Sequence, residues 1–382
     1  MTLTLLILAV FWLAYSNGAN DNFKGVATLY GSGTLTFRSA LSWATAATLV
    51  GSVLSIALAG SLARSYSGKG LVPPELLQSV GWAVPTLLIA VASAGAITIL
   101  LATLLGMPTS TTHALTGALA GIAVIASPDR SGFSKLLSEF FVPLFVSPVI
   151  AIIAASILYV LFHRFRVANG ITRETCVCVG QCAPVPVRLS MDGAALMAVP
   201  RDGGPSFMLG SKRDCVERYD GRLVGIGAQT VVNGVHTLSG LAVCFARAVN
   251  DTPKIAALLL AAGAVGWAMP TLLLVAVAMG LGGILSARKV AETMSKRITD
   301  LNPGQGLTSS LVTAFLVLIA SRLGVPVSTT HVSCGSIFGI GMVSGTARWR
   351  TIDQILLTWV TTLPMSAALG AGMYWILSSM QG

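Results

Sequence analysis

The sequence predicts an all-α polytopic membrane protein built from two repeats of inverted topology, for three reasons. Of its 382 residues, 54% are hydrophobic and only 10% are charged, against about 25% charged in an ordinary soluble protein. The 53 residues between Glu75 and Asp129 contain no Asp, Glu, Lys or Arg, and one transmembrane helix needs about 20 apolar residues. Two motifs also occur twice in the same order. The composition excludes a soluble enzyme, and the long apolar stretches favour helices over the alternating strands of a barrel.

Two motifs define the repeats. The first, Asn-Asp-Asn-Phe-Lys within residues 19–24, matches Asn-Asp-Thr-Pro-Lys within residues 249–254, 230 positions later. The second, Gly-Met-Pro-Thr-Ser-Thr-Thr-His at 106–113, matches Gly-Val-Pro-Val-Ser-Thr-Thr-His at 324–331, 218 positions later. Matching motifs in matching order predict an internal repeat.

Each repeat is expected to contain a broken helix through the Asn-Asp motif, two plain helices, a re-entrant hairpin at the Ser-Thr-Thr motif and a closing helix. In the first repeat, residues 1–163, these segments cover 3–36, 39–63, 80–105, 107–126 and 138–163. In the second repeat, residues 223–382, they cover 224–263, 267–287, 307–322, 325–345 and 352–378. In all, about 10–12 membrane segments are expected. An odd number per repeat gives the repeats opposite orientations, which is the inverted-repeat plan of secondary transporters.

Residues 164–222, between the repeats, form the only long polar segment. They are rich in Gly and Pro and contain nine Lys or Arg against six Asp or Glu, so the positive-inside bias predicts a cytoplasmic loop with both chain ends outside. The formal net charge of +10 is attributed to such topology-setting residues, and no nucleic-acid partner is expected. The cysteines of this segment lack the usual C-x2-C spacing of metal sites, so we expect free thiols and no metal at Cys176, Cys178, Cys182 and Cys215.

The charged side chains Asp21, Lys24, Asp251 and Lys254 all fall inside predicted membrane segments. Charges at this depth are costly and are functional candidates by default. Asp and Lys three positions apart share one helix face, so each pair can form a neutral ion pair, and a purely structural role is the alternative. The pair occurs in both repeats, each time after an Asn, Asn20 or Asn250, which favours a ligand site.

Pro108 and Pro326 lack backbone donors and are expected to end the helices that precede the Ser-Thr-Thr motifs. A helix that restarts there presents free N–H groups and the positive end of its dipole, which together make an anion site. The hydroxyls of both motifs can cap the helices or donate to an oxyanion: Ser110, Thr111, Thr112, Ser328, Thr329 and Thr330. Capping alone is the alternative for a single motif, whereas two copies in inverted halves favour a tetrahedral oxyanion held from two sides.

Histidines follow both Ser-Thr-Thr motifs. His113 and His331 are expected to bond local backbone carbonyls more often than to bind a ligand or relay protons. His236 is expected to be a packing residue.

At these residues the chain resembles the inorganic phosphate transporter (PiT) family of secondary transporters. The resemblance rests on the Asn-Asp motifs, the paired Pro-x-Ser-Thr-Thr-His stretches and the following Gly117 and Gly335, and it covers nearly everything except the central loop. It implies import of inorganic phosphate with co-transported Na⁺ or H⁺, by alternating access in an inverted-repeat fold. It also implies phosphate contacts from the six Ser and Thr residues above, and cation or substrate contacts from Asn20, Asp21, Asn250 and Asp251.

One departure from the family pattern concerns the cation. The family usually has Asn-Asp-x-x-Asn, whereas this chain has Lys24 and Lys254 at the last position. An Asn oxygen can ligate Na⁺, and an ammonium group cannot. The hypothesis is that these lysines stand where a cation or its ligand would be, as tethered charges facing the anion or as proton-sensitive groups. The coupling ion is left open between Na⁺ and H⁺.

Three other functions are weighed against phosphate transport. Sulfate is also tetrahedral, but it has no proton to donate, so an acceptor such as Asp21 or Asp251 would select phosphate. An intramembrane hydrolase with a Ser or Thr nucleophile and a Lys base needs one asymmetric set of residues, while this chain has two near-equal sets, and no enzymatic activity is expected. A receptor or scaffold would leave the charges in the membrane unexplained. The expected location is the plasma or inner membrane of the cell, and a homo-oligomer is one open option for the assembly.

Overall fold

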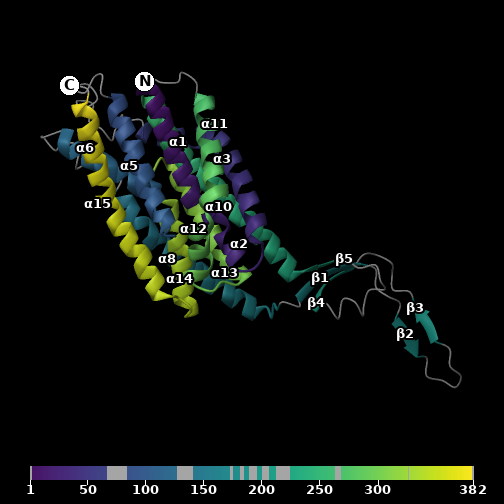
Figure 1. The fold of residues 1–382 in the computed structure, drawn as a ribbon. Coiled ribbons are helices and arrows are strands. Elements are labelled where there is room, and N and C mark those ends of the chain that lie inside the picture. Colours follow the sequence, from purple (N-terminus) through teal and green to yellow (C-terminus); the bar gives the residue numbers. More distant parts are fainter. Residues whose placement is uncertain are drawn as a thin grey trace. The chain divides into compact units, whose positions relative to one another are not determined.

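Figure 1 shows a computed structural model of the chain, in which residues 2–66, 84–126, 141–172, 175–180, 185–188, 196–199, 206–211, 224–262, 268–325 and 327–380 are described. The chain divides into two compact units. The helical unit contains residues 1–159 and 236–382, and the small unit contains residues 160–235.

The described elements of the helical unit are all helices, which fall into two series. The first series consists of α1 (Thr2–Asp21), the 3₁₀ turn η1 (Lys24–Val26), α2 (Ala27–Gly31), α3 (Phe37–Tyr66), α5 (Val84–Leu104), α6 (Thr111–Ala126) and α8 (Val142–Ala168). The second consists of α10 (Ala228–Ala261), α11 (Ala268–Ser286), α12 (Arg288–Glu292), the π-helical turn η4 (Thr293–Arg297), α13 (Pro303–Leu323), α14 (Thr329–Ser344) and α15 (Trp349–Ser379). The end of α8 and the start of α10 belong to the small unit.

Seven membrane spans can be assigned among the described helices by length and apolar composition: α1 with α2, α5, α8, α10, α11, α13 and α15. Their outer faces carry exposed apolar side chains, such as Phe145, Ile153 and Ile157 of α8, which suit contact with lipid. The predicted helical, multi-pass membrane fold is therefore confirmed. The remaining predicted segments are α3 and the short helices α6 and α14.

The short helices α6 and α14 do not have the length of a full span. Each has 16 residues and is therefore about 24 Å long, while the hydrocarbon core is about 30 Å thick. Their first turns meet, because the ring centroids of His113 and His331 lie 4.5 Å apart. In Figure 1, α6 lies near the end of the helical unit where both chain ends are marked, and α14 lies near the other end. The two short helices thus start close together and extend toward opposite ends of the helical unit.

The first Asn-Asp motif interrupts its helix, but the second does not. α1 ends at Asp21, and a single 3₁₀ turn precedes α2. In contrast, α10 is continuous over Ala228–Ala261 with Pro253 inside it, so the predicted second broken helix is wrong. The residues after the lysines explain the difference. Gly25 is a poor helix former, whereas residues 255–259, Ile-Ala-Ala-Leu-Leu, propagate a helix well.

Glycine, rather than proline, ends the helix before each Ser-Thr-Thr motif. Gly106 after α5 and Gly324 after α13 both have left-handed backbone, with φ of 72°, which glycine adopts without strain. The N–H of Met107 bonds a carbonyl five residues earlier at 2.9 Å, which completes a helix cap before Pro108 is reached. The prediction that Pro108 stops the helix is therefore wrong, and Pro326 lies outside the described residues.

The central segment, expected to be a loop, contains strands. One antiparallel sheet has the order β4-β1-β5, and β2 pairs with β3. The strands are β1 (Thr175–Gly180), β2 (Val185–Arg188), β3 (Leu196–Val199), β4 (Ser206–Ser211) and β5 (Val224–Gly227). Thr and Val in β1 favour extended backbone, a short signal inside a polar segment. Because β5 occupies residues 224–227, the helix predicted from 224 begins at Ala228.

Two of the four cysteines predicted as free thiols lie in this sheet. Cys176 and Cys178 lie in β1, and Cys182 and Cys215 lie outside the described residues. Within the part of the chain that the structure describes, no group of three or more His, Cys, Asp or Glu is placed to hold a metal ion.

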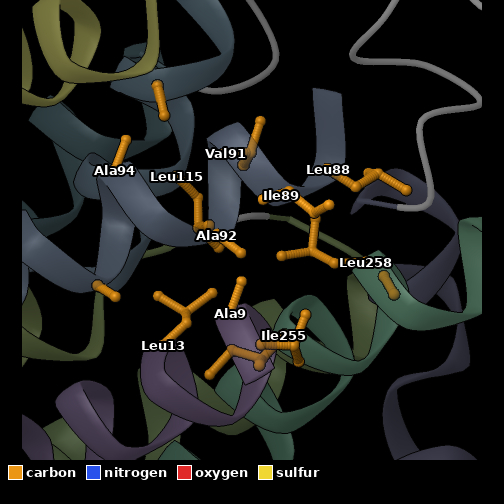
Figure 2. Packing of buried hydrophobic residues seen from close by; sticks show 14 of the residues in the cluster. Ala9, Leu13, Leu88, Ile89, Val91, Ala92, Ala94, Leu115, Ile255 and Leu258 are labelled. Carbon is orange, nitrogen blue, oxygen red and sulfur yellow. The ribbon is translucent and has the colours of Figure 1, made fainter. Parts of the chain in front are cut away.

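An apolar core packs α1 against α5, α6 and α10. Figure 2 shows Leu13 of α1, Leu115 of α6, and Ile255 and Leu258 of α10 gathered with apolar residues of α5 in one buried cluster. In lipid, helix association depends on such packing and on hydrogen bonds rather than on removal of apolar surface from water. This core includes the buried apolar residues of α6 and so holds that short helix in place.

Pairs of glycines allow the short helices to approach the closing helices. Gly117 and Gly121 of α6 face α15, and Gly335 and Gly339 of α14 face α8. A Cβ at Gly121 would lie 1.9 Å from a carbonyl oxygen of α15, and a Cβ at Gly339 would lie 2.4 Å from one of α8. The two pairs are 218 positions apart in the sequence, the offset of the Ser-Thr-Thr motifs. Both halves thus use the same small-x3-small packing.

Gly121→Ala is expected to destabilise the helical unit. The new Cβ would meet the backbone of α15, which has no rotamer that could relieve the clash, and overpacking typically costs about 1–3 kcal/mol. Thermal unfolding in detergent measures the effect. Gly372→Ala on α15 is the matched control, because a Cβ there meets nothing within 4 Å. Equal Tm values for the two variants would contradict this account.

Candidate functional site

The two Asn-Asp motifs and the two Ser-Thr-Thr motifs come together inside the helical unit. The first Asn-Asp motif lies at the break after α1 and the second in the middle of α10, while the Ser-Thr-Thr motifs begin α6 and α14. All the predicted site residues are buried: Asn20, Asp21, Lys24, Ser110, Thr111, Thr112, Asn250, Asp251, Lys254, Ser328, Thr329 and Thr330.

The serines of the Ser-Thr-Thr motifs cap the short helices. Ser110 Oγ accepts the N–H of His113 at 3.2 Å, and Ser328 Oγ accepts the N–H of His331 at 3.1 Å. Capping thus occupies an acceptor position of each hydroxyl, but each retains its own proton for donation. The N–H groups of the two threonines that follow lie in the first turn, where a helix supplies no partner for them. Both helix starts can therefore donate hydrogen bonds to an anion.

Lys24 connects the two halves of the site. Its Nζ donates to Asp21 Oδ1 at 2.5 Å and to the carbonyl oxygen of Thr109, just before α6, at 2.7 Å. It also donates to Thr330 Oγ1 of α14. The Thr330 hydroxyl in turn donates to the Thr109 carbonyl at 2.6 Å. One ammonium group thus ties the turn before α6 to the start of α14.

Lys254 makes the corresponding contacts with the halves exchanged. Its Nζ donates to Thr112 Oγ1 of α6 at 2.9 Å and to the carbonyl oxygen of Val327, just before α14, at 3.1 Å. It lies 3.6 Å from Asp251 Oδ1. Thr112 corresponds to Thr330 and Val327 corresponds to Thr109, because each pair of residues is 218 positions apart. The same contacts therefore occur twice, as an internal two-fold repeat would require.

Asn20 and Asn250 hold the turns that precede the short helices. Asn20 Nδ2 donates to the carbonyl oxygen of Met107 at 3.1 Å, and its Oδ1 accepts the N–H of Thr109 at 2.9 Å. Asn250 Nδ2 donates to the carbonyl oxygen of Val327 at 3.3 Å. Both amides bond the backbone, so they position the Ser-Thr-Thr helix starts beside the Asp and Lys pairs.

The histidines lie where the short helices meet. His331 Nδ1 is 3.0 Å from the carbonyl oxygen of Leu144 on α8, which is a backbone carbonyl but not the local one expected. Neither ring nitrogen of His113 has a hydrogen-bond partner among the described residues, so the expected carbonyl bond is not formed there. His236 Nε2 bonds Thr28 Oγ1 at 3.0 Å and thus joins α10 to α2, in keeping with a packing role.

The structure places two further residues beside the site, Asn17 and Arg247, which belong to neither motif. Arg247 is 1% exposed, and its Nη1 donates to Asn17 Oδ1 at 3.1 Å. Asn17 Nδ2 donates to Thr111 Oγ1 at 2.7 Å. The same nitrogen lies 3.4 Å from an oxygen of Asp21 and 3.3 Å from one of Asp251. Two signals were present: Arg247 is a charge within a predicted membrane segment, and it stands 230 positions after Asn17, the offset of the Asn-Asp motifs.

The charged side chains that are buried in the described structure all belong to this site: Asp21, Lys24, Arg247, Asp251 and Lys254. Three are cations and two are carboxylates, so their formal charges leave one positive charge in excess. Pairing of opposite charges offsets part of the cost of burial, and the excess charge attracts an anion. Together with two helix N-termini, these groups can hold a small anion inside the protein.

Thr330→Val is expected to lower stability, because it removes the hydroxyl that joins Lys24 to the Thr109 carbonyl in a buried place. The loss of such a bond to a charged group costs about 1–3 kcal/mol, and thermal unfolding measures it. The control is Thr361→Val on α15, since exposed Thr361 bonds only carbonyls of its own helix. Equal Tm values for both valine variants would argue against the bridge.

Known proteins are similar to this chain over nearly its whole length. Residues 17–370 match the phosphate transporter family. The chain is 27% identical over 381 residues to a probable low-affinity inorganic phosphate transporter of Bacillus subtilis, and the match covers 98% of this chain and 96% of that protein. It is 24% identical over 425 residues to inorganic phosphate transporter 2-1, chloroplastic, of Arabidopsis thaliana, which covers 98% of this chain and 72% of that protein.

A solved structure described as the sodium-dependent phosphate transporter is similar over 99% of both chains, with a TM-score of 0.73 and 21% identity. This likeness shows that the two chains share a fold. The relatives are named as transporters, and none of those compared is named as an enzyme. Because the family match extends from α1 to α15, the chain belongs to the phosphate transporter family.

Proposed function

We propose that the chain imports inorganic phosphate by symport with a cation, through alternating access around an anion site in the middle of the membrane. The observation that carries the proposal is the meeting of two Ser-Thr-Thr helix starts, each tied to the lysine of the opposite half. The proposed phosphate contacts are Ser110, Thr111, Thr112, Ser328, Thr329 and Thr330. The proposed coupling residues are Asn20, Asp21, Lys24, Asn250, Asp251 and Lys254. The proposed location is the plasma or inner membrane of the cell.

The hydrogen bonds divide five of the six proposed phosphate contacts, all but Thr329, into two kinds. Thr112 and Thr330 accept from the lysines and donate to backbone carbonyls, at 3.4 Å and 2.6 Å, so their backbone N–H groups would serve the anion. Ser110 and Ser328 act only as acceptors, and so does Thr111. Their hydroxyl protons are therefore available to phosphate oxygens. The donors come from both halves, which suits an ion with oxygens on every side.

The carboxylates favour phosphate over sulfate. Asp21 and Asp251 both lie within 3.4 Å of Asn17 Nδ2, beside the starts of the short helices. A carboxylate can accept a hydrogen bond but cannot donate one. Phosphate retains a proton near neutral pH and can donate it to such an acceptor, whereas sulfate cannot. Sulfate transport remains the second candidate, because helix N-termini bind both anions.

The groups around the two lysines favour one choice of co-transported cation. Each ammonium group is surrounded by a carboxylate, a backbone carbonyl and a threonine hydroxyl, and such oxygens are also the ligands of hard cations. Lys24 and Lys254 would then replace two bound cations with charges fixed to the chain. Inward movement of one negative charge against 100 mV costs about 2.3 kcal/mol, so a mobile cation is still required. With the two positions filled by lysine, H⁺ is favoured over Na⁺ as that ion.

Radiolabelled phosphate counterflow in proteoliposomes tests the proposed function. Wild-type protein should exchange internal for external phosphate, and unlabelled phosphate should compete more strongly than sulfate. Empty liposomes are the control for leakage. A hydrolase, receptor or scaffold would exchange no ion, and stronger competition by sulfate would assign the site to that anion instead.

The double variant Lys24→Asn with Lys254→Asn tests the proposed role of the lysines. It leaves two buried carboxylates unpaired, which is strongly destabilising unless Na⁺ replaces the ammonium groups. Phosphate uptake should therefore become dependent on Na⁺, or more dependent than in wild type, when NaCl replaces choline chloride at fixed pH. Lys296→Asn is the control, because Lys296 is exposed and bonds the hydroxyl of Tyr30, which belongs to neither motif. Unchanged cation dependence in the double variant would refute the tethered-cation role.

A further inference from the structure

Arg247 is a buried charged residue that neither predicted motif includes. Its Nη1 donates to Asn17 Oδ1 at 3.1 Å. Its Nη2 donates to Thr48 Oγ1 at 2.7 Å and to Asn22 Oδ1 at 3.4 Å. Its Nε has no hydrogen-bond partner among the described residues, although the side chain is only 1% exposed. The guanidinium group is thus bonded through its two terminal nitrogens and keeps one buried N–H donor unused. Buried polar groups are normally hydrogen-bonded, so this is unexpected for a residue with only a packing role.

The bond to Arg247 fixes the orientation of the Asn17 amide. A guanidinium group only donates hydrogen bonds, and of the two ends of an amide side chain only the oxygen accepts. Asn17 therefore turns Oδ1 to Arg247 and Nδ2 to Thr111, Asp21 and Asp251. Because Thr111 Oγ1 accepts from Nδ2, its hydroxyl proton points elsewhere. If the Asn17 amide were flipped, its Oδ1 would accept a hydrogen bond from the Thr111 hydroxyl. That hydroxyl would then no longer be available as a donor to an anion.

Arg247 also breaks the symmetry of the two halves. At the 230-position offset of the Asn-Asp motifs, Arg247 corresponds to Asn17, so a charge stands in one half and a neutral amide in the other. The two Asp–Lys pairs are each neutral in formal charge. Arg247 alone therefore supplies the excess positive charge among the buried residues that the structure describes.

We propose that Arg247 is a specificity-determining residue of the anion site, which acts through Asn17 and gives the site its single excess positive charge. A site with that charge is matched to a monovalent oxyanion, such as phosphate that carries two protons. The inference rests on the proposed function, because it concerns the same anion site. Arg247 is a positioning residue in this scheme, since its contact with the hydroxyl of Thr111 runs through Asn17.

The test measures phosphate counterflow for purified wild type, Arg247→Gln, Arg247→Lys and Asn17→Leu. Arg247→Gln should raise KM by about ten-fold or more, as expected for lost contacts of a charged group, with a smaller change in the maximal rate. Arg247→Lys keeps the charge but replaces the planar fork, which bonds Asn17 and Thr48 from two separate nitrogens, with a single nitrogen on a shorter side chain. Its KM should therefore fall between those of wild type and Arg247→Gln. Asn17→Leu should also raise KM, because Thr111 loses the amide that orients it.

The control is Arg350→Gln, which removes a positive charge from an exposed position at the start of α15 and should leave KM unchanged. A folded Arg247→Gln protein with a KM within two-fold of wild type would overturn the inference, as would an Arg247→Lys variant no better than Arg247→Gln. If Arg247→Gln fails to fold, an unchanged KM in Asn17→Leu would overturn it as well. If wild-type protein exchanges no phosphate, the proposed function is wrong, and this inference, which depends on it, is wrong as well.

Discussion

The site depends on two ammonium groups that are each shared between the halves of the protein. Lys24 and Lys254 each take a carbonyl oxygen from the turn of one half and a hydroxyl from the short helix of the other. A lysine this deeply buried is costly unless it is paired and its donors are used. Asp21 and Asp251 provide the counter-charges. The lysines therefore hold the two short helices together, and the helices in turn complete the hydrogen bonding of the lysines.

Glycines, rather than the prolines of the Ser-Thr-Thr motifs, end the helices and form the turns at the site. Gly106 and Gly324 turn the chain with left-handed backbone, and the next residues expose the carbonyl oxygens that the lysines bind. Asn20 then holds the first turn from the other side through the N–H of Thr109. Backbone groups that would be unsatisfied inside a membrane are thus used to build the site.

Much of this arrangement could be predicted from sequence. Low charge and long apolar stretches predicted the helical membrane fold, and repetition of the motifs predicted which residues would meet. The sequence did not show how the hydroxyls divide their hydrogen bonds, since Thr111 and Thr112 are adjacent and identical in type. It also did not show that α10 stays continuous, because Pro253 ends a helix in most settings and here is tolerated. Arg247 was missed because its counterpart, Asn17, differs from it in residue type and charge, so the two do not form a matching motif although they are 230 positions apart.

The glycine pairs on α6 and α14 have a consequence for movement. Where backbone lies directly on backbone, as at Gly121 and Gly339, neither helix can slide along its neighbour without a steric clash. α6 and α15 should therefore move as one rigid body, and α14 and α8 as another. The bodies touch at the starts of the short helices, where the lysine bridges cross from one to the other. Trp359 of α15 also packs on His331 and Phe338 of α14, so the two bodies would separate along these contacts and the lysine bridges rather than along the glycine seams.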